Sequence, residues 1–421
     1  MEEEFMKVAE LLEAVLGTAD IPVHIAAYDG STLGPPDAAT TLRFVSPDAV
    51  HRIITARGKE LGFARAIIAG DIEIEGDIFG IFEINRLVEN PNLDRSMIRP
   101  AAELIGIESV RDLAKLRPLP PPPEEIRLSG KLHSRQRDAE AISSHYDVSN
   151  EFYDLVLGTS MTYSCAVFDS ADDDLVTAQS NKHDLICRKL ALEPGMRHLD
   201  IGCGWGSMVI HAARNYGVHS VGVTISQEQA ERARKRVADE GLSEQIEIRV
   251  QDYRDVSDGP FDAISSIGMA EHVGGQEKLR EYFQHVRSLL APEGRYLNHA
   301  IGRSPKVTYG DDGFIQRYVF PDGELHELGE TTTALQEAGF EARHMESFRL
   351  HYARTLRQWV ENLESNWDAA VTEVGLGRAT IWRIYMAGSA VGFEQGDLEL
   401  HHVLAIPHET PNDSVPFRQS W

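Results

Sequence analysis

Short apolar segments alternate with helical segments between residues 175 and 300 of this 421-residue chain. Strands this short and apolar are typical of a parallel sheet that is buried on both faces. Because parallel strands are joined by crossovers, the alternation predicts an α/β fold with helices on both faces of the sheet. The predicted helices are 175–192 and 227–240, and the predicted strands are 197–201, 219–224, 246–250, 261–267 and 294–300.

The segments on either side complete this part of the chain. Helices are predicted at 142–157 and near 331–338, and strands near 342–351 and 398–406. Two long helical segments, 355–371 and 378–393, are rich in Leu, Trp, Ile, Tyr and Met. They could line a tunnel for an apolar chain, although an aromatic stripe on a helix is also typical of ordinary core packing.

A run of prolines marks the clearest boundary in the chain. Pro118 and Pro120 to Pro123 favour an extended, semi-rigid spacer. We therefore predict a first domain at 1–116, a linker at 117–125 and a larger second domain at 126–421. The first domain is predicted to be a small α+β domain without a catalytic cluster. Its predicted elements are a helix at 3–16 and strands at 23–28, 41–44 and 71–75.

The composition excludes several classes of protein. The sequence contains no run of about 18 apolar residues, so no membrane-spanning helix is predicted. The N-terminus lacks the pattern of a signal peptide, which favours a cytoplasmic location. The net charge of −25 disfavours nucleic-acid binding, and contact with an anionic membrane would need a local patch. Lys131, Arg135 and Arg137 are either such a patch or a solvated face. The three cysteines have the spacing of neither a disulfide framework nor a metal site.

A glycine-rich loop follows the first strand of the alternating region. The strand ends near Asp200, and Gly202, Gly204 and Gly206 follow at alternate positions. Glycines let the backbone approach a ligand, and the N-terminus of the next helix adds a positive dipole. The G-x-G-x-G spacing differs from the dinucleotide pattern and fits S-adenosylmethionine (SAM). A glycine turn without a ligand is the alternative, but the position in a βα series favours a ligand site.

Two later strand ends carry polar residues that suit the same ligand. Thr224 and Gln229 follow the second strand, where an acidic residue often holds a ribose diol, and they could make those hydrogen bonds instead. Asp252 and Tyr253 follow the third strand and suit the amino group and ring face of adenine. A helix N-cap and a plain loop are the alternatives for the two segments. Their order along the sheet favours a SAM site.

Four further motifs distinguish the chain: His145–Asn150 (HYDVSN), Thr162–Ala166 (TYSCA), Gly268–Gly274 (GMAEHVG) and Asn298–Gly302 (NHAIG). With the glycine loop, they make the chain resemble the cyclopropane fatty acid synthase family, which includes the mycolic acid methyltransferases. The resemblance covers about residues 135–407 and implies a Rossmann-like class I SAM-dependent methyltransferase sheet with helical acyl-binding insertions. The N-terminal domain resembles, in position, the extra domain of longer members that act on phospholipids. We therefore expect it to serve oligomerisation and lipid presentation.

The resemblance also implies two sets of site residues. The family transfers a methyl group from SAM to a cis double bond in a lipid acyl chain, and Tyr163 and Ser164 would contact SAM with the residues named above. Taken singly, a cysteine, glutamate or histidine at these places could equally be a core residue, a helix N-terminal carboxylate or a satisfied strand-end histidine. Their common position near the carboxyl ends of strands favours a site. The residues that match the bicarbonate-holding positions of the family are Cys165, Glu271, His299, Ile301 and Tyr352.

Methylation of an alkene needs a dry pocket that tolerates positive charge. The alkene attacks the sulfonium methyl in line and becomes a carbocation, which aromatic faces stabilise by roughly 0.5–2 kcal/mol each. A buried base must then remove a proton, and bicarbonate can serve. A charged Glu271 would repel that anion, so we expect Glu271 to orient His299 or a backbone donor, or to share a proton with the ion. The aromatic candidates are Tyr163, Phe168, Tyr318 and Tyr352.

Two products are compatible with the sequence. Direct proton loss closes a cyclopropane, whereas a prior hydride shift leaves a methylene branch. A flavin- or nicotinamide-dependent reductase could saturate that branch, as in tuberculostearic acid synthesis. Arginine outnumbers lysine 32 to 9, as in high-GC genomes, and Ser389 stands where phospholipid enzymes of the family often carry a cysteine. Both observations favour the methylene branch slightly.

The expected enzyme is a homo-oligomer that acts on unsaturated phospholipid acyl chains. It would be cytoplasmic and peripheral to the inner face of the membrane, without metal or nucleic acid. The alternatives are a methyltransferase for a soluble small molecule and a non-catalytic lipid-binding protein.

Overall fold

The structure is a computed structural model with two compact units. Unit 1 comprises 1–127, 309–319 and 367–391, and unit 2 comprises 128–308, 320–366 and 392–421. The predicted linker at 117–125 lies close to the first change of unit, but unit 1 also contains two later segments, so the predicted domain bounds stay a prediction. The residues that the structure describes are 6–17, 20–56, 59–87, 101, 103–105, 116–132, 134–135, 137, 140–141, 149–307, 313–409 and 415–419.

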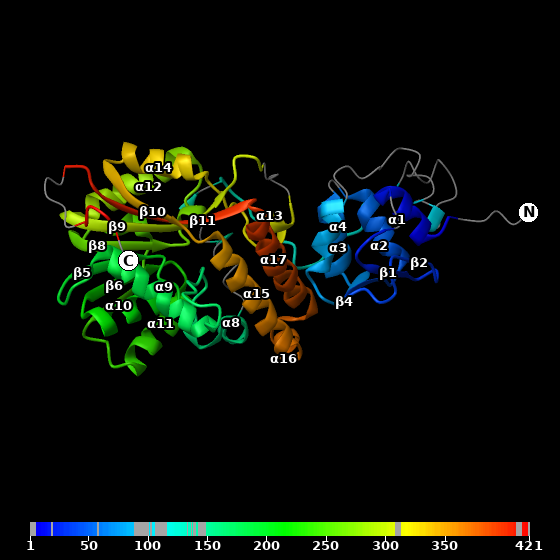
Figure 1. Ribbon diagram of the computed structural model, residues 1–421, viewed down its shortest axis with the longest axis horizontal. Helices are drawn as coiled ribbons and strands as arrows, with labels where there is room; N and C mark the ends of the chain where they lie inside the picture. The colour runs from blue at the N-terminus through cyan, green and yellow to red at the C-terminus, as the bar shows by residue number, and fades with distance from the viewer. Residues whose placement is uncertain are drawn as a thin grey trace, which may run out of the picture. The chain divides into compact units, whose positions relative to one another are not determined.

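Unit 2 is built on a seven-stranded sheet in the order β10-β11-β9-β8-β5-β6-β7 (Figure 1). The five strands from β7 to β9 are parallel, whereas β11 runs antiparallel between β9 and β10. The strands are β5 Arg197–Ile201, β6 His219–Thr224, β7 Ile246–Val250, β8 Phe261–Ile267, β9 Leu290–Arg303, β10 Phe340–Ser347 and β11 Leu398–Pro407. The predicted α/β fold is confirmed.

Helices cover both faces of this sheet. Figure 1 shows α12 and α14 on one face and α9, α10 and α11 on the other. Separate groups of buried apolar side chains fill the space between each layer of helices and the strands. The helices are α9 Leu175–Leu190, α10 Ser207–Tyr216, α11 Gln227–Asp239, α12 Gln276–Leu289 and α14 Leu328–Glu337. Two of these helices have a hydrogen-bonding N-cap side chain. Asp174 accepts from Thr177 N at the start of α9, and Ser226 accepts from Gln229 N at the start of α11.

One predicted strand is too long at its carboxyl end. The strand predicted near 342–351 ends at Ser347, and α15 Arg349–Ser365 begins there. Phe348 N donates to Leu400 O as the last contact with β11, and Tyr352 N donates to Phe348 O as the first helical turn. The apolar-polar alternation of residues 348–351 resembles a strand, but packing of the following residues selects the helix. The helix predicted at 355–371 is divided at Asn366 between α15 and α16 Trp367–Val374, and the helix predicted at 378–393 is observed as α17 Leu376–Gln395.

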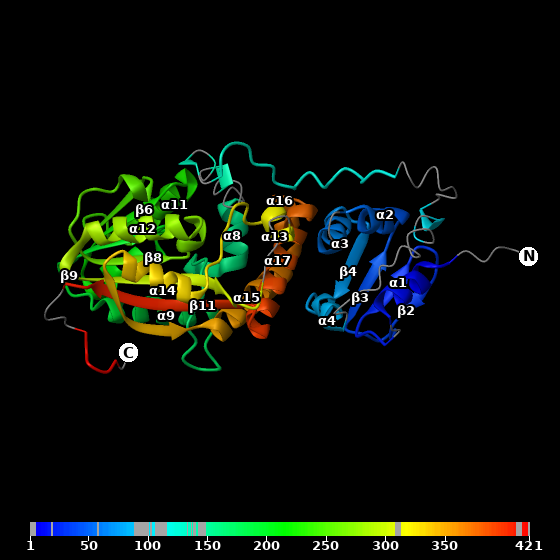
Figure 2. The same cartoon turned by 90° about the horizontal axis from the view of Figure 1, so that it is seen from above.

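Unit 1 contains a four-stranded sheet in the order β2-β1-β3-β4, with short helices (Figure 2). Strands β1 and β3 are parallel, and the outer pairs are antiparallel. The predicted strands are observed, whereas β2 and helices α2 to α4 were not predicted. The elements are α1 Val8–Leu16, β1 His24–Ala27, β2 Thr32–Leu33, β3 Thr40–Phe44, α2 Pro47–Thr55, α3 Lys59–Ile68, β4 Ile72–Gly76 and α4 Gly80–Leu87. Later parts of the chain add α13 Phe314–Tyr318, α16 and most of α17.

The described residues contain neither a membrane-spanning helix nor a cluster of metal ligands. None of the helices there is both long and apolar enough to cross a membrane. The same part of the chain holds no group of three or more His, Cys, Asp or Glu side chains arranged to bind a metal ion.

Candidate active site

A pocket lies at the carboxyl ends of the parallel strands β5, β6, β7 and β8. This edge is where open α/β sheets bind ligands. Gly206 is the one predicted cofactor residue that does not line the pocket. The other nine line it together: Tyr163, Ser164, Asp200, Gly202, Gly204, Thr224, Gln229, Asp252 and Tyr253.

Two glycines of the loop have different roles: one borders the pocket and the other allows close packing of helices. Gly204 has φ +52°, and a Cβ built there meets no atom within 4 Å, so a side chain would enter open space at the pocket. Gly206 has φ +82° and begins α10. A Cβ on Gly206 would lie 3.2 Å from the Ala233 Cβ of α11. Gly204 therefore leaves room for a ligand, whereas Gly206 lets two helices approach.

Asp200 and Lys182 are buried charged residues on the pocket wall. Ser265 Oγ donates to Asp200 Oδ1 at 2.6 Å, and burial raises the pKa of Asp200 to about 6. Lys182 Nζ donates to Ser164 Oγ at 2.9 Å and lies 3.1 Å from His183 Nε2. Burial lowers the pKa of Lys182 to about 7, although Cys165 and Asp200 oppose the shift. The sequence does not predict Lys182 at the site, because a lysine within an amphipathic helix normally faces solvent.

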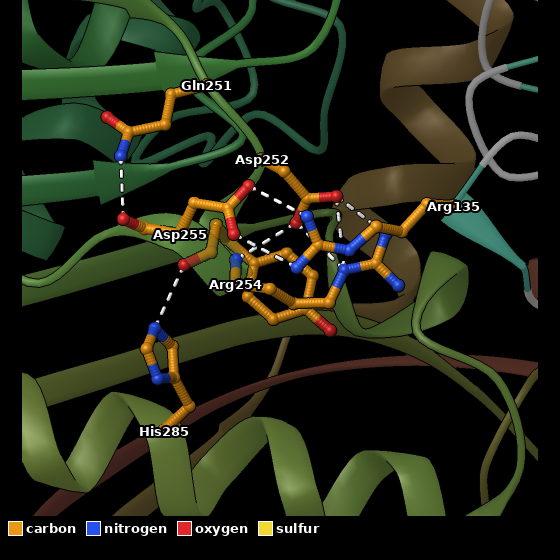
Figure 3. A network of polar contacts seen from close by, with 7 residues as sticks. Arg135, Gln251, Asp252, Arg254, Asp255 and His285 are labelled. Carbon is orange, nitrogen blue, oxygen red and sulfur yellow. Dashed lines mark hydrogen bonds and ion pairs between the residues drawn. The ribbon is translucent and has the colours of Figure 1, made fainter.

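A polar network forms the rim of the pocket after β7 (Figure 3). Arg254 Nη2 donates to Asp252 Oδ2 at 2.6 Å, and Asp252 Oδ1 also accepts from Arg254 N. Arg135 forms two hydrogen bonds of 2.9 Å with the Asp255 carboxylate. Gln251 Nε2 donates to Asp255 O. The Asp252 side chain therefore lies at the pocket but is held by Arg254.

The basic cluster predicted beside the linker is largely neutralised by carboxylates. Arg135 pairs with Asp255, and Arg137 donates to both oxygens of Asp322 at 2.5 and 2.8 Å. Two of its three cations thus have a carboxylate partner, which weakens the interpretation as a basic patch for an anionic membrane.

Aromatic rings continue from the pocket. The Tyr163 ring lies 5.7 Å from Tyr153 and 5.3 Å from Trp359, and Trp359 lies 6.0 Å from Tyr352. Phe168 does not line the pocket and instead packs under the Arg354 guanidinium at 4.0 Å. Tyr318 belongs to unit 1, where its hydroxyl donates to Glu125 Oε2 at 3.0 Å. Tyr163 and Tyr352 are thus the two predicted aromatic candidates that share one row of rings.

Glu271 and Ile301 form the first pair among the predicted ion-site residues. Ile301 N donates to Glu271 Oε1 at 2.7 Å, which matches the expectation that Glu271 orients a backbone donor. Burial raises the pKa of Glu271 to about 7, and the hydrogen bond from Ile301 lowers it only in part. Within the described residues, Glu271 Oε2 is buried without a hydrogen-bond partner.

His299, Cys165 and Tyr352 are connected through Phe348. His299 Nδ1 lies 2.8 Å from His402 Nε2, and the His402 ring packs against Phe348 with ring centroids 4.4 Å apart. Cys165 Sγ lies 3.8 Å from Phe348 O, which also accepts from Tyr352 N. Burial raises the pKa of the Cys165 thiol well above its usual range, so the thiol stays protonated. Among the described atoms, His299 Nε2 is buried with no hydrogen-bond partner.

The comparison with protein families decides the assignment. Residues 133–403, more than half of the chain, match the family described as mycolic acid cyclopropane synthetase. The chain belongs to the mycolic acid cyclopropane synthetase family. Of the four motifs behind the predicted resemblance, residues 145–148 lie outside the described part of the structure.

Relatives and solved structures agree with the family. The chain is 47% identical over 431 residues to a protein named probable fatty acid methyltransferase from Mycobacterium tuberculosis, which covers 99% of this chain and 98% of the relative. It is 38% identical over 285 residues to the cyclopropane-fatty-acyl-phospholipid synthase of Escherichia coli, which covers 67% and 72%. The crystal structure of mycolic acid cyclopropane synthase CmaA1 with SAH and CTAB matches with a TM-score of 0.60 and 31% identity, over 63% of this chain and 97% of that chain.

Membership of this family confirms the predicted resemblance and fold class. The family consists of SAM-dependent methyltransferases that act on fatty acyl chains, and this protein is a SAM-dependent methyltransferase. The pocket at the glycine loop has the position and the lining that such an enzyme needs for its cofactor.

Proposed function

We propose that the protein methylates the cis double bond of unsaturated phospholipid acyl chains, with a bound bicarbonate as the base. Two buried atoms without described partners carry this proposal: Glu271 Oε2 and His299 Nε2. Glu271 lies in the short turn that follows β8, and His299 lies on the neighbouring parallel strand β9, where its carbonyl oxygen accepts from Gly268 N. Unpaired buried polar atoms are costly, and a small polar ion between them would satisfy both.

The chemistry of these two residues suits an anion. At neutral pH a carboxyl group with a pKa of about 7 is protonated in a large share of molecules, so Glu271 can donate a proton to an ion oxygen. This removes the like-charge repulsion that the sequence raised. The neutral Cys165 thiol and the Tyr352 hydroxyl add no negative charge. When bound, bicarbonate supplies a base for the proton lost from the substrate.

The residues at the glycine loop suit SAM, which supplies the electrophilic methyl group when bound. Gly204 leaves open space, α10 directs its N-terminus towards the loop, and Tyr163 presents an aromatic ring on the pocket wall. The proposed roles are to bind SAM, to hold it in one orientation and to exclude water. Tyr163, Trp359 and Tyr352 provide aromatic faces along which a carbocation can be stabilised.

The proposed substrate follows from the relatives' names. The Escherichia coli relative is named as an enzyme of fatty-acyl phospholipids, and the Mycobacterium tuberculosis relative as a fatty acid methyltransferase. We further propose a cytoplasmic homo-oligomer at the inner face of the membrane, with unit 1 in oligomerisation and lipid presentation. A flavin- or nicotinamide-dependent reductase is the proposed partner if the product is a methylene branch.

The product is the part of the proposal that an experiment can decide directly. Purified protein would be incubated with SAM and vesicles of cis-unsaturated phospholipid, and the extracted lipid examined by proton NMR. A methylene branch gives olefinic exomethylene signals, whereas a cyclopropane gives signals far upfield. We expect the methylene branch. Upfield ring signals would replace this product by the cyclopropane, and an unmodified lipid together with a methylated soluble compound would refute the lipid substrate. A reaction that proceeds unchanged in bicarbonate-free buffer would refute the proposed base.

A further inference from the structure

A row of polar side chains, buried except at its Glu346 end, leads from His299 across the sheet. His402 on β11 lies directly opposite His299 on β9, and Glu346 on β10 lies directly opposite His402. Lys189 of α9 lies over this row, with Nζ 3.2 Å from His402 Nδ1 and 2.6 Å from Glu346 Oε2. The Lys189 side chain is fully buried, whereas the Glu346 side chain is 41% exposed.

The charged pair of Lys189 and Glu346 at one end of the row determines which atom donates in each of its hydrogen bonds. Burial lowers the pKa of Lys189, but the hydrogen-bonded Glu346 carboxylate opposes this shift and favours the ammonium form, which only donates. His402 Nδ1 must therefore accept from Lys189, which leaves the proton of a neutral His402 on Nε2. Burial keeps both imidazoles neutral, because it lowers the pKa of His299 and His402 well below the usual range. His402 Nε2 then donates to His299 Nδ1 at 2.8 Å.

The last member of the row, His299, is one of the predicted ion-site residues. Since its Nδ1 accepts, His299 must carry its proton on Nε2, the atom without a described partner. An N–H buried in this way requires an acceptor. We propose that Lys189 and His402 are positioning residues that fix His299 as an Nε2–H donor, so that the site binds an oxyanion. This inference rests on the proposed ion site.

The phenyl ring of Phe348 holds the row in place. It lies 5.1 Å below Lys189 Nζ and packs against the His402 ring. Its carbonyl oxygen is the one that accepts from Tyr352 N and lies near the Cys165 thiol. Phe348 therefore contacts both the row and two other predicted ion-site residues, Tyr352 and Cys165. A shift of the row would move Phe348 and with it these residues.

The tautomer of His299 can be measured directly. Protein labelled with nitrogen-15 in histidine gives distinct ring-nitrogen shifts for protonated and unprotonated sites, and the spectrum of His299→Gln identifies the His299 signals. In the natural sequence we expect a protonated Nε2 and an unprotonated Nδ1. Lys189→Met fills the same space without a donor, so His402 is no longer forced into one tautomer. We expect His299 to become a mixture, with at least about a tenfold increase in the bicarbonate concentration needed for half-maximal turnover.

A pair of substitutions at His402 separates hydrogen bonding from packing. Glutamine keeps an acceptor for Lys189 and a donor for His299 on one side chain, so His402→Gln should retain the tautomer and most of the bicarbonate affinity. His402→Leu should lose both. The affinity for SAM, measured by calorimetry, should stay within about twofold in all variants, because none of these residues lines the pocket.

The outcomes distinguish this inference from the function on which it rests. A His299 tautomer that is the same in Lys189→Met, or that already has its proton on Nδ1 in the natural sequence, overturns the role of the row. A tautomer that responds to Lys189→Met in an enzyme indifferent to bicarbonate retains the positioning role and refutes bicarbonate as the ligand. Equal bicarbonate affinity in His402→Leu and His402→Gln would also overturn the inference.

Discussion

Glu271 accepts the backbone N–H of Ile301 at 2.7 Å while its second carboxylate oxygen is buried without a described partner. Because burial raises the pKa of this carboxyl group, the free energy of unfolding of the protein depends on pH. The pKa of Glu271 is about 7 in the folded protein against an ordinary value of 4.5, so the folded state binds more protons between these values. Its contribution to the free energy of unfolding therefore falls as pH rises from about 4.5 to 7.

We predict that Glu271→Gln removes this dependence. Glutamine can still accept from Ile301 N but never ionises, so the variant should gain stability over the natural protein as pH rises from 5 to 8. The limit is on the order of 3 kcal/mol above pH 7. Denaturant unfolding at several pH values measures the difference, with the exposed Glu193→Gln as control. A constant difference across this range would mean that Glu271 is ionised throughout.

The second prediction concerns turnover. Glu271→Gln and Tyr352→Phe should reduce kcat by about two orders of magnitude or more, the usual scale for loss of support to a general base. SAM affinity should stay near normal, because neither residue lines the pocket. Ser389→Ala should have a mild effect, since the chain has no thiol at that position. Natural turnover in both site variants would remove these residues from the reaction.

The third prediction tests the cofactor pocket. Gly204→Val should abolish SAM binding, because the side chain enters the open space at the glycine loop. Gly195→Val is the matched control: it also has a positive φ, +85°, and open surroundings, but it does not line the pocket. Both variants carry similar backbone strain. Calorimetry should show lost affinity only for Gly204→Val, and equal losses would indicate backbone strain instead of a cofactor contact.

The fourth prediction concerns a buried ion pair in unit 1. Arg65 forms two hydrogen bonds of 2.8 Å with Glu125, whose side chain is 3% exposed. Arg65→Met should destabilise the protein by about 2–4 kcal/mol, because it leaves a buried carboxylate with weaker partners. Arg43→Met removes the exposed pair with Glu75 and should cost less than about 1 kcal/mol. Similar losses in the two variants would mean that Glu125 is well solvated.

The parallel strands could be predicted from the sequence more closely than any other element. Strands β5 to β8 have the predicted bounds, because each is a short segment rich in Ile, Val, Leu or Phe that lies between loop residues and alternates with a helix. Strand β9 extends beyond the predicted 294–300 because it pairs with β11, a contact between distant segments. Helix α15 begins earlier than predicted because Tyr352, Leu356 and Trp359 are buried on one face of it. That burial depends on tertiary packing.

The candidate site could be predicted in part. The position of the pocket could be predicted, because ligands bind at the carboxyl ends of parallel strands and this depends only on the order of strands and loops. The residues that the sequence analysis missed, Lys182, Lys189 and His402, lie within regular elements. Nothing local distinguishes them from an exposed helical lysine or an ordinary strand histidine. Their burial and contacts follow from the packing of α9 on the sheet and from the pairing of β11 with β9.

The position of β11 in the sheet has a consequence for biosynthesis. This strand is the last regular element among the described residues, yet it inserts between β10 and β9, which are made earlier (Figure 1). Until residues 398–407 leave the ribosome, His402 is absent from the sheet. His299 then lacks its hydrogen-bond partner, and no side chain connects it to Lys189 and Glu346. A nascent chain can therefore complete the glycine loop and its pocket wall well before the ion site. Cofactor binding and catalytic competence should arise in that order during synthesis.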